Sequence, residues 1–187
     1  DLHSFPTRRS SDLHIESSLS DMYTVPAWTL NGRVVPYAGA APGTLPAPGE
    51  TRMRATFRPL YLRAWSPQFD ERYAIRVERI EAPVLLLSAG GDELWPSAIG
   101  SEKIVARLKA HAFSYPVEHI AYEGAGHAIS QPATLVYSLG QRAFHPAVKS
   151  YIPIGGTPEA SSAATLDGVA RAISWIKRHA RSGGGAD

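Results

Sequence analysis

The sequence predicts an α/β fold with a mostly parallel sheet flanked by helices. Two segments, residues 83–88 and 117–122, have the length and composition of strands, and residues 97–110 between them have the periodicity of a helix. A second helical pattern covers residues 163–179. Strands that alternate with helices along a chain are typical of βαβ units, in which neighbouring strands run parallel. We therefore expect the two strands to belong to one parallel sheet.

The strand at residues 83–88 is the clearest element. Its sequence, Pro-Val-Leu-Leu-Leu-Ser, is a short apolar run typical of a parallel strand that is buried on both faces. In the strand at residues 117–122, successive side chains are expected on opposite faces: Val117, His119 and Ala121 on one, and Glu118, Ile120 and Tyr122 on the other. A glycine-containing turn follows each strand, at residues 89–92 and 123–126, so the chain can turn tightly there.

Both helices show an apolar face. In the first, Ile104, Val105 and Leu108 lie on one side and Lys and Arg on the other. In the second, apolar residues recur at i, i+3, i+4, i+7 and i+10 and form one stripe: Leu166, Val169, Ala170, Ile173 and Ile176.

Turn-forming residues predict the connections. Asn31-Gly32 is a strong turn dipeptide, and residues 38–50 are rich in Gly, Pro and Ala, as in an irregular loop. Residues 146–158 are expected to form a second loop, and residues 181–187 a flexible tail. Residues 51–62 fit either a short helix or an extended segment.

The composition fits a globular chain and argues against several functions. Of the 187 residues, 44% are hydrophobic and 19% are charged, and the formal net charge is only +2. No run of Lys and Arg suggests a nucleic-acid groove, and no apolar stretch reaches the ~18 residues of a membrane span. No secretion signal is visible, so we expect a cytoplasmic protein with no nucleic-acid partner, no membrane span and no evident protein partner.

The chain contains no cysteine. This excludes disulfides, thiolate metal sites and a cysteine nucleophile within the 187 residues. It also contains no HExxH motif or comparable set of metal ligands. We therefore expect neither a metal nor a cofactor.

The first thirteen residues differ in character from the rest. Residues 1–13 resemble one translated reading frame of a common short-read sequencing adapter over their whole length. We expect them to be artefactual, with the natural sequence starting near His14 and lacking its true N-terminus. Residues 14–180 would then be part of a larger domain.

Asp92 and His127 each follow a predicted strand, in a glycine-containing turn. The carboxyl ends of parallel strands form the edge where open α/β sheets bind ligands. The two residues are 127 − 92 = 35 positions apart, enough for one helix and the second strand. Neighbouring strands would bring them together, and a carboxylate beside a histidine can fix the ring tautomer and stabilise the imidazolium. The order acid, then histidine, fits the nucleophile–acid–His order of α/β-hydrolases.

Spacing alone leaves other interpretations open. An Asp after a strand often caps a helix or a turn, and a His there is often structural. Glu93 is an alternative acid, although it would point away if Asp92 points in. His119 lies inside the strand and fits a structural or solvent-facing role better. The other candidates are expected in surface or loop positions: His111, His145 and His179.

Several stretches resemble the C-terminal catalytic domain of acyl-CoA thioester hydrolases and bile-acid-CoA:amino-acid N-acyltransferases. The resemblance covers most of residues 22–180, and it is most specific where Asp-Glu-Leu-Trp-Pro-Ser and Gly-Ala-Gly-His occur together. The stretches that carry it are residues 28–32, 36–37, 75–80, 83–88, 91–97, 117–120, 122–127, 151–153 and 155–159.

This family is an α/β-hydrolase, so the resemblance implies that residues 14–180 are the C-terminal part of an incomplete α/β-hydrolase fold. It implies Asp92 as the triad acid and His127 as the general base. The implied substrate is an acyl-CoA thioester, attacked by a nucleophile to give an acyl-enzyme that water or an amino acid's amine then cleaves.

The sequence departs from the family at the nucleophile. No serine has glycine two residues before it and two residues after it, as the nucleophile elbow requires, and no cysteine is present. Ser17, Ser18 and Ser20 lie nearest the expected place but lack the glycines of an elbow. We therefore expect the chain alone to be inactive. The alternatives are a dienelactone-hydrolase-like carboxylic ester hydrolase and a noncatalytic remnant.

Overall fold

The structure is a computed structural model, and it describes residues 29–34, 58, 62, 74–139, 141–145 and 150–180. The described residues divide into a smaller unit (29–34, 62, 74–75, 144–145 and 150) and a larger unit (58, 76–139, 141–143 and 151–180). The expectations for residues 1–13, 38–50 and 181–187, and for the serines at 17, 18 and 20, lie outside the described residues.

The smaller unit contains a two-stranded antiparallel pair, β1 (Thr29–Leu30) and β2 (Arg33–Val34). Asn31 and Gly32 connect the strands with φ angles of 51° and 75°. Positive φ at both central residues is the requirement of a tight hairpin turn, and Asn-Gly satisfies it with the least strain. The turn predicted at this dipeptide is therefore confirmed.

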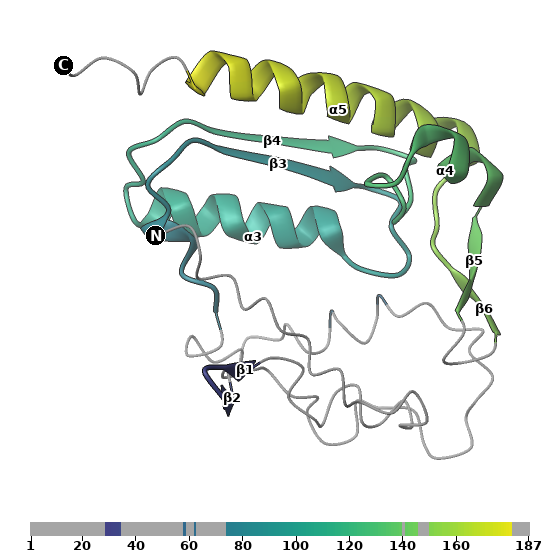
Figure 1. Ribbon diagram of the computed structural model, residues 1–187, viewed down its shortest axis with the longest axis horizontal. Coiled ribbons are helices and arrows are strands. Elements are labelled where there is room, and N and C mark those ends of the chain that lie inside the picture. Colours follow the sequence, from purple (N-terminus) through teal and green to yellow (C-terminus); the bar gives the residue numbers. More distant parts are fainter. Residues whose placement is uncertain are drawn as a thin grey trace. The chain divides into compact units, whose positions relative to one another are not determined.

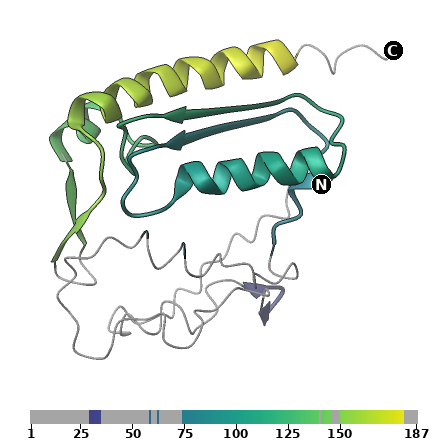
Figure 2. The ribbon, with the colours of Figure 1, turned by 180° about the vertical axis from the view of Figure 1, so that it is seen from behind.

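The larger unit is an α/β layer structure. Its parallel strands β3 (Val84–Ala89) and β4 (Val117–Tyr122) pair in register from Val84 opposite Val117 to Ala89 opposite Tyr122. Helix α3 (Ser97–Ala110) covers one face of the pair and α5 (Pro158–Ala180) covers the other (Figures 1 and 2). The strand–helix–strand order and the parallel pairing predicted from the sequence are confirmed.

The burial of β3 differs from the prediction. Leu85, Leu86 and Leu87 are half-buried, whereas Ser88 and Ala89 at the carboxyl end are buried. Among the described strands β3 pairs with β4 alone, so its side chains lack neighbours from a second flanking strand. The expected burial on both faces is therefore reached only at the end of the strand that carries the turn to Asp92.

An ion pair attaches α3 to the short 3-10 helix η2 (Val77–Arg79). The guanidinium of Arg107 donates through Nη2 to Oε1 of Glu78 at 2.9 Å and through Nε to Oε2. This paired hydrogen bond from Arg107 lowers the pKa of the Glu78 carboxyl to about 2, so it stays ionised at neutral pH.

A second polar contact attaches α5 to β4. The Tyr122 hydroxyl donates to Oδ2 of Asp167 at 2.8 Å, and Arg171 pairs with the same carboxylate one turn further along α5. Burial of Tyr122, with the hydrogen bond to Asp167, raises the pKa of the phenol to about 12. The hydrogen bond from Arg171 lowers the pKa of Asp167, so the carboxylate remains an acceptor for the tyrosine.

Helix α5 begins five residues before the predicted start at residue 163. Thr157 caps it, since its Oγ1 accepts a hydrogen bond from the backbone N–H of Ala160 at 3.1 Å. Pro158 then occupies the first helical position, where a missing N–H costs nothing. Thr157 and Pro158, which the sequence prediction places at the end of the preceding loop, are therefore a helix start.

That predicted loop also contains a strand. β6 (Ser150–Pro153) pairs with β5 (Arg142–His145), and the seven-residue helix α4 (Ala133–Leu139) precedes them. Proline and glycine around these short elements hide their periodicity. Of the predicted loop, residues 146–149 lie outside the described part of the chain.

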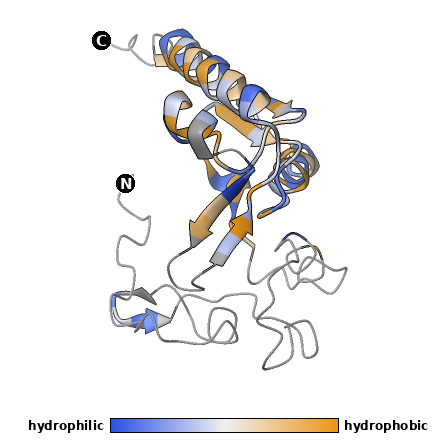
Figure 3. Ribbon diagram, turned by 90° about the vertical axis from the view of Figure 1, so that its right-hand side faces the viewer, coloured by the Kyte–Doolittle hydropathy of each residue, from blue (hydrophilic) through white to orange (hydrophobic). Residues whose placement is uncertain are grey.

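The apolar stripe of α5 does not face the sheet. Leu166, Val169, Ile173 and Ile176 are 64%, 57%, 48% and 63% exposed, and hydrophobic positions alternate with hydrophilic ones along the helix in Figure 3. The residues that face inward are small or polar, except for Trp175: Ser161, Ala164, Thr165, Gly168 and Trp175. A Cβ added to Gly168 would lie 3.4 Å from Cδ1 of Leu87, so small residues allow the close approach of helix and sheet.

Truncating one leucine in each helix compares the contribution of a buried side chain with that of the exposed stripe. Leu108 of α3 is 1% exposed and Leu166 of α5 is 64% exposed. We expect Leu108→Ala to lower the free energy of unfolding by ~2–5 kcal/mol, because it leaves a cavity. Leu166→Ala should change it by less than ~0.5 kcal/mol. Urea denaturation of both variants measures the difference, and equal losses would mean that the stripe is packed in solution.

Candidate active site

The candidate site lies at the carboxyl ends of β3 and β4. Asp92 follows β3 by three residues and His127 follows β4 by five. Because the strands are parallel neighbours in register, both turns emerge at the same edge of the sheet. The structure brings the two side chains into hydrogen-bond contact, with 3.0 Å between Nδ1 of His127 and Oδ2 of Asp92.

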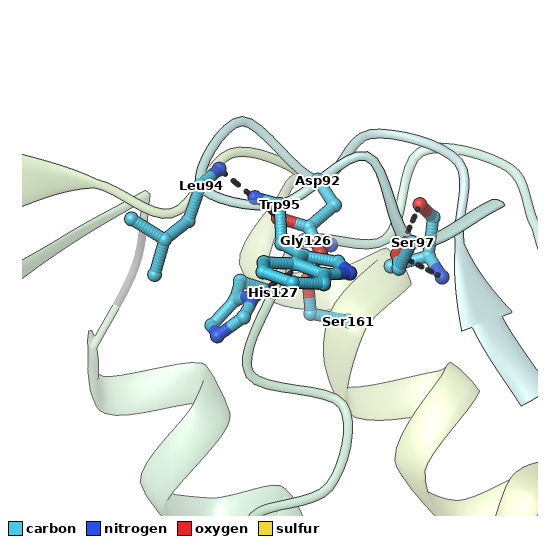
Figure 4. Close-up of polar contacts among 8 residues, drawn as sticks. Asp92, Leu94, Trp95, Ser97, Gly126, His127 and Ser161 are labelled. Carbon is cyan, nitrogen blue, oxygen red and sulfur yellow. Dashed lines mark hydrogen bonds and ion pairs between the residues drawn. The ribbon is translucent and has the colours of Figure 1, made fainter. Parts of the chain in front are cut away.

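The Asp92 carboxylate is buried and held from two sides. Oδ1 accepts hydrogen bonds from the backbone N–H groups of Leu94 at 3.0 Å and Trp95 at 2.8 Å (Figure 4). Oδ2 faces the His127 ring, and Asp92 is only 3% exposed. The backbone amides fix the orientation of the carboxylate, so its second oxygen is directed at the histidine.

Hydrogen bonds made by the ring and by the backbone of His127 fix its orientation. A carboxylate accepts hydrogen bonds, so in this contact the N–H at Nδ1 of His127 donates a hydrogen bond to Oδ2 of Asp92. The lone pair then resides on Nε2, the atom that a general base uses. The backbone N–H of His127 donates to the carbonyl of Ile154 at 2.8 Å, and the side chain remains 42% exposed. A buried carboxylate therefore orients an accessible imidazole.

The turns that carry the two residues pack backbone against backbone. A Cβ added to Gly126 would lie 2.0 Å from the Gly155 carbonyl oxygen, and one added to Gly155 would lie 2.0 Å from that of Gly91. One added to Gly156 would lie 2.1 Å from the Gly126 nitrogen. No side chain fits at these three positions, so glycine is what allows the turns to approach closely enough for the Asp92–His127 contact.

The other sequence candidates lie elsewhere. Glu93 is exposed, and within the described residues it makes no hydrogen bond to His127. His119 is on the α3 side of β4, where its Nε2 lies 2.8 Å from the Ser88 hydroxyl, a structural contact. His111 ends α3 and is exposed. His179 is not a simple surface residue, because its ring packs on Trp175 at 4.4 Å. The side chain of His145 lies outside the described part of the structure.

Sequence reasoning missed one buried group beside the site. Ser161, in the first turn of α5, accepts a hydrogen bond on its Oγ from the backbone N–H of Gly126 at 2.9 Å. The Thr-Pro-Glu helix start could have indicated that Ser161 lies in the first turn of α5, but the contact of that turn with Gly126 is tertiary and has no signal in the local sequence.

Two further observations concern the described residues only. They contain no grouping of three or more His, Asp or Glu side chains arranged to hold a metal ion. None of their helices combines the length and the apolarity needed to cross a membrane.

Comparison with known proteins identifies the family. The family described as BAAT / Acyl-CoA thioester hydrolase C terminal matches residues 56–182, which is more than half of the chain and includes both Asp92 and His127. The chain belongs to this family, and the resemblance seen in the sequence is confirmed.

The chain is also similar to individual thioesterases of mouse and rat. The chain is 35% identical over 102 residues to acyl-coenzyme A thioesterase 2, mitochondrial, of Mus musculus, a match that covers 54% of this chain and 22% of that protein. It is equally similar to acyl-coenzyme A thioesterase 1 of Mus musculus and of Rattus norvegicus, with 54% of this chain and 23% of each protein covered. The matched stretch therefore spans less than a quarter of the length of these curated relatives.

Proposed function

We propose that Asp92 and His127 are the acid and the base of a nucleophile–His–Asp triad that cleaves acyl-CoA thioesters. The observation that carries this proposal is the 3.0 Å contact between a buried, amide-anchored carboxylate and an accessible imidazole. Membership of the acyl-CoA thioester hydrolase family supports the choice of substrate. Residues 14–180 would then be the C-terminal part of an α/β-hydrolase fold.

In the proposed reaction Nε2 of His127 takes the proton of the nucleophile as that group attacks the thioester carbonyl carbon. Asp92 stabilises the imidazolium that forms. The carbon–sulfur bond breaks, the proton passes from His127 to the departing CoA thiolate, and an acyl-enzyme remains. His127 then takes a proton from water, or from an amine, as that group attacks the acyl carbon. The bond between the acyl carbon and the nucleophile breaks, His127 returns the proton to the nucleophile, and a carboxylic acid or an amide is released. Acyl-CoA is the substrate, and the reaction needs no metal or cofactor.

The nucleophile of this triad would come from residues outside this 187-residue chain. The chain has no cysteine and no serine in a Gly-x-Ser-x-Gly elbow, and the described residues contain no hydroxyl hydrogen-bonded to the His127 ring. The chain matches less than a quarter of its thioesterase relatives, which leaves room for such a segment. We propose a serine or cysteine on an elbow upstream, and an inactive chain in its absence.

The test compares the 187-residue chain with an extended protein. In the extended protein, the residues encoded upstream of His14 in the genomic DNA take the place of residues 1–13. Both are assayed for release of free CoA from acetyl-, octanoyl- and palmitoyl-CoA with a thiol-reactive dye; the 187-residue chain has no cysteine to react with it. We expect activity in the extended protein alone, with a roughly 10⁴–10⁶-fold loss in His127→Ala. Mass spectrometry of the products with and without an added amino acid separates hydrolysis from transfer.

Other outcomes would favour the alternatives. Thioester cleavage by the 187-residue chain that disappears in His127→Ala would place the nucleophile within it. Cleavage of simple esters but not of acyl-CoA by the extended protein would favour a dienelactone-hydrolase-like esterase. An upstream sequence without a nucleophile elbow would indicate a noncatalytic remnant.

A further inference from the structure

We infer that Ser161 and Thr165 of α5 form a positioning clamp for His127, an inference that rests on the proposed function. Both hydroxyls are buried, Ser161 at 3% and Thr165 at 6% exposed. They lie one helical turn apart and bond to the chain on either side of His127. Neither reaches the reacting atoms, so the pair acts through the histidine.

The Ser161 half of the clamp holds the residue before His127. Its Oγ accepts the backbone N–H of Gly126 at 2.9 Å, and Gly126 is buried. A glycine rotates more freely than other residues, so its peptide groups need external partners to stay in one orientation. Without Ser161 this N–H would be buried without a partner, and the Gly126–His127 segment would shift to satisfy it.

The Thr165 half holds the chain two residues after His127. Its Oγ1 lies 3.0 Å from the carbonyl oxygens of Ile129 and Ser161, and the hydroxyl donates toward them. The first contact ties the segment after His127 to α5, and the second is made within the helix, to the backbone of Ser161. The bonds of Ser161 to Gly126 and of Thr165 to Ile129 together hold the segment on both sides of His127 against a helix.

The composition of α5 supports a role beyond packing. The helix directs two hydroxyls toward the segment that follows β4, while Leu166 and Val169, its larger apolar residues nearby, remain exposed. Packing alone would favour apolar residues on the buried face, since a buried hydroxyl costs free energy unless it is hydrogen-bonded. Here both hydroxyls are bonded to the segment that carries His127, so their burial orients that loop.

The inference is tested in the 187-residue chain, without reference to activity. Long-range ¹H–¹⁵N spectra of the histidine side chains report the tautomer of His127 and the exchange of its Nδ1 proton. In the unaltered chain we expect a single Nδ1–H tautomer. Ser161→Ala and the isosteric Thr165→Val should each give a mixed tautomer or at least tenfold faster exchange of this proton. Ser161→Thr, which retains the oxygen, should restore the original spectrum.

Ser101→Ala is the matched control, because Ser101 is a 9% exposed serine on α3, on the other face of the sheet. It should leave the His127 signals unchanged. The inference is overturned if folded Ser161→Ala and Thr165→Val keep the original His127 signals, or if Ser101→Ala disturbs them equally. In the extended protein, the two clamp variants should lower kcat by roughly 10–100-fold with KM unchanged. Failure of thioester cleavage there would refute the proposed function but not the spectroscopic result.

Discussion

Asp92→Asn in the extended protein is expected to lower kcat for thioester cleavage by roughly 10⁴-fold. The amide oxygen can still accept the N–H groups of Leu94 and Trp95, which leaves the NH₂ group facing His127. Two donors cannot share that contact, so Nδ1 must become the acceptor and the proton must move to Nε2. The ring then has no lone pair where the nucleophile's proton has to go. The rate of CoA release measures the loss.

The effect of Asp92→Asn on the His127 tautomer can be measured in the absence of the nucleophile. In the 187-residue chain, ¹H–¹⁵N spectra should show His127 changing from the Nδ1–H to the Nε2–H tautomer. Glu93→Gln is the control, since Glu93 is exposed and adjacent in sequence to Asp92. It should change neither the rate nor the tautomer. If Asp92→Asn retained more than about a tenth of the activity, the triad assignment of Asp92 would be wrong.

Gly126→Ala should destabilise the chain by at least ~3 kcal/mol. The added Cβ would lie 2.0 Å from the oxygen and 2.6 Å from the carbon of the Gly155 carbonyl, and 2.8 Å from the oxygen of Ile154. All three atoms belong to backbone, so no side chain can move aside. The turn after β4 would have to separate from the segment after β6, and the His127 N–H bond to Ile154 would be lost with it. Urea denaturation followed by circular dichroism measures the change.

Gly124→Ala is the matched control two residues earlier in the same turn. Gly124 has a φ of 73°, but a Cβ there would only touch Ala160 at 3.5 Å. The cost should be that of a left-handed alanine, ~1–2 kcal/mol. Equal losses for the two variants would contradict the close backbone packing around Gly126.

The local elements of the βαβ unit could be predicted because each has a strong pattern of its own. The helix at 97–110 and the strand at 117–122 have the predicted bounds, and β3 is displaced by one residue. Once the two strands were assigned to one parallel sheet, the positions of Asp92 and His127 followed from topology alone. Their contact could therefore be expected without any knowledge of side-chain geometry.

The orientation of α5 could not be predicted in the same way. Periodicity shows which residues share a face, but the buried face depends on how closely the sheet approaches. At Gly168 an added Cβ would already touch Leu87 at 3.4 Å, and the other inward residues of α5 are small or polar except for Trp175. The bonds of Ser161 and Thr165 depend on that same tertiary contact and have no signal in the local sequence.

Because the apolar stripe of α5 faces outward, the exposed side of this helix can be engineered without changing its buried side. Leu166, Val169, Ile173 and Ile176 lie on the exposed side, opposite the face that contacts the strands and the histidine loop. Exchanging them for Lys, Glu or Gln would convert an apolar surface into a polar one without altering a contact of Asp92 or His127. The same positions would also serve for attaching a fluorophore through a single introduced cysteine, since the chain contains no other thiol.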